Sequence, residues 1–61
     1  MLTFVIYLDN ANQYRWRLFA GNNRIVADSG QGYHHLRDCE SEVEQIKKNA
    51  PTAQVQVKTP R

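Results

Sequence analysis

The sequence predicts an α+β fold with the element order β-β-β-α-β, in which one helix covers one face of an antiparallel sheet. Two clusters of Asn, Asp and Gly separate three short runs of strand-forming residues. A longer stretch then repeats apolar residues at spacings of three and four, and a final run alternates apolar with polar residues. With 61 residues, 41% of them apolar and 23% charged, the chain has room for one domain, which we assign to residues 1–61.

The first two strands are expected to form a hairpin. Residues 3–8 are rich in β-branched and aromatic side chains and lack Gly and Pro, which favours a strand. The Asx-rich cluster 9–12 is typical of a hairpin turn. The second strand, 13–20, alternates in character, so one side should face the core (Tyr14, Trp16, Leu18 and Ala20) and the other should face outward (Arg15, Arg17 and Phe19).

A third strand and a connector are expected next. Gly21, Asn22 and Asn23 accept positive φ, which indicates a tight turn. Residues 24–28 then form a short strand that completes a three-stranded meander. The run Ser-Gly-Gln-Gly-Tyr at 29–33 is interpreted as a flexible connector.

A helix is predicted over residues 35–49. Apolar positions three and four residues apart form one stripe that should face the sheet (Leu36, Cys39, Val43, Ile46 and Ala50). Acidic residues lie in its first half, and Lys47 and Lys48 lie in its last turn, which complements the helix dipole. Pro51 follows closely and indicates where the helix ends.

The last strand is predicted from a run in which apolar and polar residues alternate (Ala53, Gln54, Val55, Gln56, Val57 and Lys58). A strand that follows a helix has to pair with a sheet edge, because its backbone groups otherwise stay unpaired. The residues alone leave two arrangements open, which are pairing within the chain and exchange with a second copy.

The size of the chain favours self-association. A domain of about 60 residues buries only about 60% of the surface of its unfolded chain. Domains this small usually rely on a disulfide, a metal or a second chain. Cys39 is the single cysteine, which excludes an internal disulfide. We therefore expect the chain to pair with a second copy of itself as a homodimer.

Three motifs place this chain near a known family. They are Tyr-Arg-Trp-Arg-Leu at 14–18, Ser-x-x-Gly-Tyr at 29–33 and Val-x-x-Ile-Lys-Lys-Asn-Ala at 43–50. In this order and spacing the sequence resembles the YegP-like family, bacterial proteins of unknown function. The resemblance implies β(3)-α-β units, in tandem or in two chains, that assemble into one sheet with exchanged C-terminal strands. It thus implies a homodimer in which residues 53–58 cross to the partner.

No metal site, cofactor site or catalytic site is predicted. His34, His35 and Cys39 are the only grouped soft ligands, whereas zinc takes about four ligands, or three and a water. Cys39 also lies on the apolar helix stripe, so we interpret it as a core residue. The two glycines at 30 and 32 lack the Lys-Ser/Thr of a phosphate-binding loop. We expect a protein that is not an enzyme.

The outward sheet face is the candidate binding surface, because it interleaves cations with aromatic rings (Tyr7, Arg15, Arg17, Phe19 and Lys58). Such a surface binds single-stranded nucleic acid by stacking and phosphate contact, which is our alternative function. Two interpretations compete with this one, which are a solvated or packing face without a ligand and a face that binds another protein. They remain open because arginine side chains also lie over apolar surface where no nucleic acid binds. A net charge of +2 provides only weak electrostatic attraction for a nucleic acid.

The sequence predicts neither a membrane span nor a secretory leader. Its longest apolar stretch, residues 4–8, is far shorter than the roughly 20 residues that a spanning helix needs. A basic start and a small-residue cleavage site are both missing from the first residues. We therefore expect a cytoplasmic protein without membrane partners.

Overall fold

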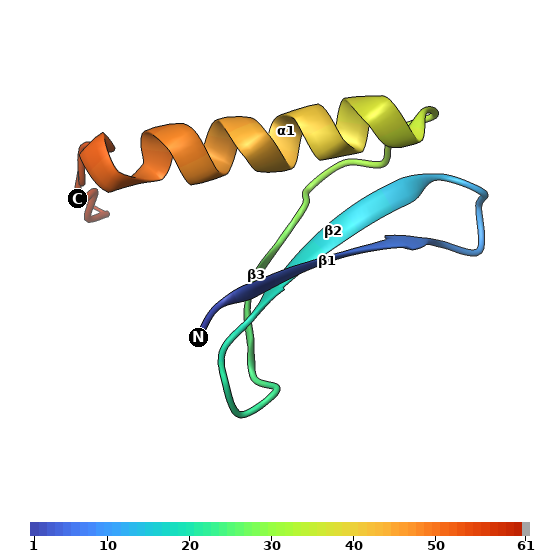
Figure 1. The fold of residues 1–61 in the computed structure, drawn as a ribbon. Helices are drawn as coiled ribbons and strands as arrows, with labels where there is room; N and C mark the ends of the chain where they lie inside the picture. The colour runs from blue at the N-terminus through green and yellow to red at the C-terminus, as the bar shows by residue number, and fades with distance from the viewer. Residues whose placement is uncertain (61) are drawn as a thin grey trace.

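The computed structural model of the chain describes residues 1–60 and contains a three-stranded sheet and one long helix. The strands are β1 (Thr3–Leu8), β2 (Tyr14–Phe19) and β3 (Ile25–Asp28), and they lie in the order β1-β2-β3. The helix α1 (Leu36–Asn49) lies over one face of this sheet and continues into a short 3-10 turn, η1 (Ala50–Thr52), as Figure 1 shows. The predicted α+β class and the order of its first four elements are confirmed.

The β1–β2 hairpin forms as predicted. Its antiparallel register runs from Thr3 opposite Phe19 to Leu8 opposite Tyr14. The carboxylate of Asp9 closes the turn, because its Oδ1 accepts hydrogen bonds from the backbone N–H groups of Ala11 (2.8 Å) and Gln13 (3.0 Å). Turn residue Asn12 has a φ of 62°, a left-handed conformation that asparagine tolerates.

The β2–β3 hairpin contains a feature that the sequence did not predict. Asn23 has a φ of 63° in the expected turn. Leu18 pairs with Ala27 and Phe19 pairs with Ile25, so the register shifts by a bulge between the two β2 residues. A bulge bends and twists the strand pair locally.

The connector 29–33 is held against β2, whereas the sequence predicted a flexible segment. The backbone N–H of buried Ser29 donates to the carbonyl of Trp16 (2.9 Å), and its hydroxyl accepts from the Trp16 N–H (3.2 Å). Tyr33 and Tyr14 exchange two backbone hydrogen bonds of 2.8 Å each. A Cβ on Gly32 would collide with the side chain of Gln13, so the close approach at this point requires glycine.

The core is small and lies under the middle of α1. Among residues 1–60, the buried apolar side chains are Cys39, which is 0% exposed, and Val43, which is 7% exposed. On the sheet, the rings of Phe4 and Trp16 meet edge to face, with centroids 5.4 Å apart. Leu36 was predicted to be buried on the same stripe but is exposed, as is Ala50, because both stand at the ends of the helix region where the sheet does not cover them.

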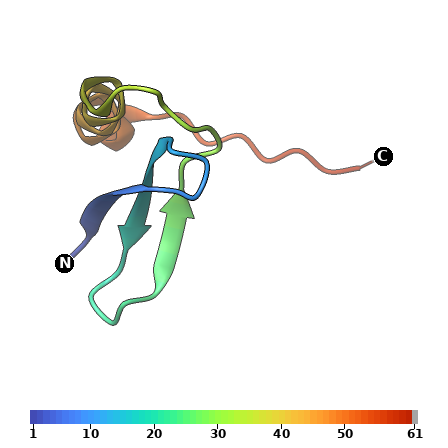
Figure 2. The ribbon, with the colours of Figure 1, turned by 90° about the vertical axis from the view of Figure 1, so that its right-hand side faces the viewer.

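The predicted last strand does not form within a single chain. Residues 53–60 lie outside any strand, and Figure 2 shows this segment leaving the body of the molecule. Val55 and Val57 are 89% and 84% exposed. A strand requires a neighbouring edge to pair with, and η1 directs the chain away from its own sheet.

Candidate functional site

The open face is the side of the sheet opposite α1, and it carries four of the five predicted binding residues. The register places Tyr7 opposite Arg15 and Val5 opposite Arg17, and the alternation of β2 adds Phe19. Lys58 is not part of this surface, because it lies in the exposed C-terminal segment.

Both arginines of the open face interact with groups of the chain itself. The Arg15 Nε lies 2.6 Å from Asp9 Oδ2 in an ion pair. Hydrogen bonds from the Gln13 backbone, and then from Arg15, lower the pKa of the Asp9 carboxyl. The guanidinium of Arg17 lies over the ring of Tyr7, 4.7 Å from its centroid, in a cation–π contact. The two cations are therefore less available to a phosphate than the sequence suggested.

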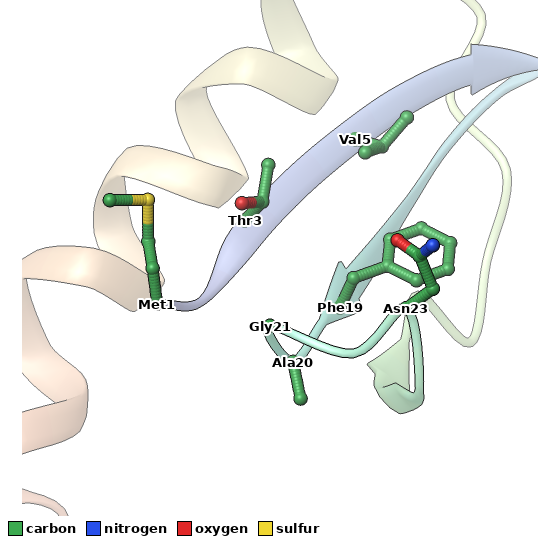
Figure 3. Close-up of a pocket in the computed structure, with 7 residues that line it drawn as sticks. All are labelled: Met1, Thr3, Val5, Phe19, Ala20, Gly21 and Asn23. Carbon is green, nitrogen blue, oxygen red and sulfur yellow. The ribbon is translucent and has the colours of Figure 1, made fainter.

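The opposite end of the open face is hollow. A cavity of about 370 Å³ lies there, between β1 and the β2–β3 turn, and Figure 3 shows the residues that line it (Met1, Thr3, Val5, Phe19, Ala20, Gly21 and Asn23). Phe19 thus lines a hollow that also includes the polar side chains of Thr3 and Asn23, and it is not part of the cation–π contact between Arg17 and Tyr7. Val5 was not among the predicted binding residues, although the alternation along β1 places it on the same face as Tyr7.

A second cavity, which we call the α1 wedge, opens between the end of α1 and the sheet. It has a volume of about 480 Å³, and Figure 1 shows α1 and β1 diverging at this end of the molecule. Six apolar residues and Lys47 line it (Leu2, Phe4, Leu18, Ile46, Ala50 and Pro51). Ile46 and Ala50 were predicted to face the core, but helical spacing alone does not reveal whether the sheet extends far enough to cover them.

The remaining chemical groups do not assemble into a site within the described residues. Cys39 is fully buried, as predicted, and burial raises the pKa of its thiol. His34 and His35 are exposed at the start of α1. Across residues 1–60, no group of three or more His, Cys, Asp or Glu side chains is suited to hold a metal ion. None of the helices in this range has the length and apolar character to cross a membrane.

Comparisons with known proteins agree with the fold. Residues 9–56 match the family described as a domain of unknown function, DUF1508. A UPF0339 protein of Treponema denticola is 44% identical over 52 residues, which cover 85% of this chain and 88% of the relative. A UPF0339 protein of Methanosarcina acetivorans is 42% identical over 55 residues, 90% of this chain and 93% of the relative.

A solved structure and a longer relative complete the comparison. The solution structure of a protein from Haloferax volcanii superposes with a TM-score of 0.85 at 40% identity, covering 93% of this chain and 95% of that one. A UPF0339 protein of Stutzerimonas stutzeri is 45% identical over 80% of this chain but only 43% of its own length. Given the match over 9–56 and these identities, the chain belongs to the DUF1508 family, the UPF0339 or YegP-like proteins of unknown function.

Proposed function

We propose that this chain is a non-enzymatic structural and interaction module that works as a homodimer, in which residues 53–58 of each copy pair with the sheet of the other. The observation that carries this proposal is the incomplete core. Among residues 1–60, only Cys39 and Val43 are buried apolar residues, while Val55 and Val57 are almost fully exposed.

The exposed segment has the composition of a strand that lacks its neighbour. Ala53, Val55 and Val57 alternate with polar residues, so an extended backbone would place the three on one side. Fully burying a valine contributes about 1.5–3 kcal/mol. Docking of two such segments in a symmetric dimer doubles this gain and also pairs backbone groups that a sheet edge leaves free.

The resemblance to the YegP-like family implies the same arrangement. It implies β(3)-α-β units that occur in tandem or in separate chains. The Stutzerimonas stutzeri relative, of which this chain covers 43%, has a length that accommodates two such units. A chain with a single unit would obtain the second one from another copy.

Nucleic-acid binding through the open face is the alternative prediction, and the contacts of its arginines do not favour it. Arg15 is paired with Asp9, and Arg17 lies over Tyr7. Titration of single-stranded RNA and DNA at two salt concentrations tests this alternative. Binding that weakens with salt and is lost in Arg15→Glu/Arg17→Glu would establish it.

The dimer is tested by sedimentation equilibrium over a wide range of protein concentration. We expect a dimer for the intact chain and a monomer for a chain that ends at Thr52. Val55→Asp/Val57→Asp should weaken the dimer at least tenfold, whereas the matched Gln54→Asp/Gln56→Asp, on the other side of the strand, should change it little. A folded intact chain that remains a monomer at high micromolar concentration would refute the proposal.

A further inference from the structure

We infer that the open face binds a small carboxylic acid that carries an aromatic ring. The ring enters the cavity of about 370 Å³ at one end of this face, shown in Figure 3, which we call the open-face hollow. The carboxylate pairs with Arg17, which stands beside the hollow. This inference is independent of the homodimer, because a strand that joins the edge of a sheet leaves the face of that sheet uncovered.

The open-face hollow combines apolar side chains with polar groups. Phe19 lies on β2 directly opposite Thr3, and Val5, which is 42% exposed, adds a second apolar side chain from β1. The hydroxyl of Thr3 and the side-chain amide of Asn23 supply polar groups. The cavity lies at the small end of the range of about 300–1,000 Å³ that is typical of binding pockets, so it suits a single ring. Such a ring gains from packing against the ring of Phe19.

The guanidinium of Arg17 provides a positive charge next to this hollow. Val5 lies directly opposite Arg17 in the register, and Phe19 follows Arg17 by two residues on the same side of β2. At about 3.3 Å per residue, Arg17 and Phe19 are therefore about 7 Å apart along the strand. Among residues 1–60, Arg17 takes part in no ion pair, and its buried Nε has no hydrogen-bond partner. The chain thus leaves hydrogen-bonding capacity of this guanidinium unused.

The contact with Tyr7 does not remove this capacity. The guanidinium lies 4.7 Å from the centroid of the Tyr7 ring. A cation–π contact supplies electrostatic attraction but no acceptor oxygen, so the N–H groups of the arginine still require acceptors. A carboxylate accepts two parallel hydrogen bonds from a guanidinium, and these are stronger than bonds between neutral groups. Arg17 is therefore positioned to bind a carboxylate while it remains over Tyr7.

The charges around Arg17 favour a ligand with a single negative charge. Arg15 is already paired with Asp9, and Asp28 of β3 lies opposite Arg17 in the register. A polyanion binds by having several of its charges neutralised, and it would also bring negative charge close to Asp28. One carboxylate joined to one ring matches one guanidinium beside one hollow.

The site is tested by titrating the isotope-labelled intact chain with phenylbutyrate and following its backbone amide signals by NMR. A ligand of about a dozen non-hydrogen atoms should bind with a dissociation constant on the order of 1 mM. Two analogues divide its chemistry, since phenylbutyramide has the ring without the charge and butyrate has the charge without the ring. Each should bind about fivefold more weakly or worse. The shifted signals should belong to the hollow and its neighbour (Thr3, Val5, Arg17, Phe19 and Asn23).

Substitution of the arginine separates the carboxylate from the ring. Arg17→Gln should weaken the binding of phenylbutyrate about fivefold or more and leave the binding of phenylbutyramide unchanged. The matched control is Arg37→Gln, the same change at an exposed arginine of α1, on the other side of the sheet, and it should leave both affinities within about twofold of the wild-type values. Asp28→Asn removes the carboxylate opposite Arg17 and should tighten the binding of phenylbutyrate.

A carboxylate introduced into the chain itself should block the site. Val5→Glu places an acidic side chain directly opposite Arg17, where it competes with the ligand and should abolish the binding of phenylbutyrate. Leu8→Glu is the matched control, because Leu8 is also an exposed apolar residue of β1 but alternates onto the other face. The NMR spectrum of each variant verifies that the fold is kept.

Three results would overturn the inference. The first is the absence of saturable shifts with phenylbutyrate up to about 10 mM, roughly ten times the expected dissociation constant. The second is equal affinity for phenylbutyrate and phenylbutyramide in the wild-type chain, a comparison that needs no variant and would show that Arg17 does not hold the carboxylate. The third is a set of shifts confined to the α1 wedge. None of these results bears on the homodimer, which sedimentation measures separately.

Discussion

The two ends of α1 differ in how well they are packed, although one apolar stripe runs along the whole helix. Near its start, Ser29 and Tyr33 tie the connector to β2, and Cys39 and Val43 are buried. Towards its end, Ile46 and Ala50 line the open α1 wedge. The difference shows that an amphipathic helix buries its stripe only where a second layer is held beneath it. Where that layer is missing, the same pattern leaves apolar side chains lining an open cavity.

The largest changes in stability should come from truncating one apolar side chain in each half of the helix stripe. Val43→Ala removes buried methyl groups and should lower the free energy of unfolding by about 2 kcal/mol, at every protein concentration. Ile46→Ala should lower the free energy of unfolding by less, because Ile46 is only half-buried and lines the open α1 wedge. Urea denaturation at low and high protein concentration measures both. An equal, concentration-independent loss in the two variants would remove the distinction between the two ends.

A smaller loss is expected at the glycine that permits the connector to approach β2. Gly32→Ala places a Cβ against the Gln13 side chain and should cost about 1–2 kcal/mol. Gly30→Ala is the matched control, because no atom lies within 4 Å of the added Cβ and the change should be neutral or slightly stabilising. If thermal unfolding ranks the two variants in the opposite order, the connector is not held as described.

The hydroxyl of Ser29 should contribute about 1 kcal/mol to the packed end. Ser29→Ala removes the buried oxygen that accepts from the Trp16 N–H, although the backbone bond between the same residues remains. Ser41→Ala, at an exposed helix position, serves as the control and should not lower stability. Equal melting temperatures for the two variants would show that the hydroxyl bond is unimportant.

The smallest effect concerns acid stability at the β1–β2 turn. Because the folded pKa of Asp9 is lowered, its carboxylate contributes stability above the ordinary aspartate pKa of about 3.9, and this contribution is lost as the pH falls through the lowered value. Asp9→Asn should therefore flatten the dependence of stability on pH in that acidic window. Chemical denaturation at a series of pH values from neutral to acid measures the slope, and an unchanged slope would exclude Asp9 as its source.

Features that depend on residues close together in the chain could be predicted from the amino-acid pattern. The strand at 3–8, the alternation along β2 and the helix stripe through Cys39 and Val43 all follow from periodicity. The two turns follow from asparagines that tolerate positive φ. Four of the five candidate binding residues could be placed on one face in the same way, because a strand alternates with a period of two.

Features that depend on residues distant in the chain became visible only in the folded molecule. The pairing of Arg15 with Asp9, the position of Arg17 over Tyr7 and the wedge under the end of α1 require elements to meet in space. The segment 53–58 has the alternation of a strand yet forms none in one chain, since a strand exists only with a hydrogen-bonded neighbour. The local pattern indicates which secondary structure a segment is able to form. Whether that structure forms depends on a neighbouring surface to pair with.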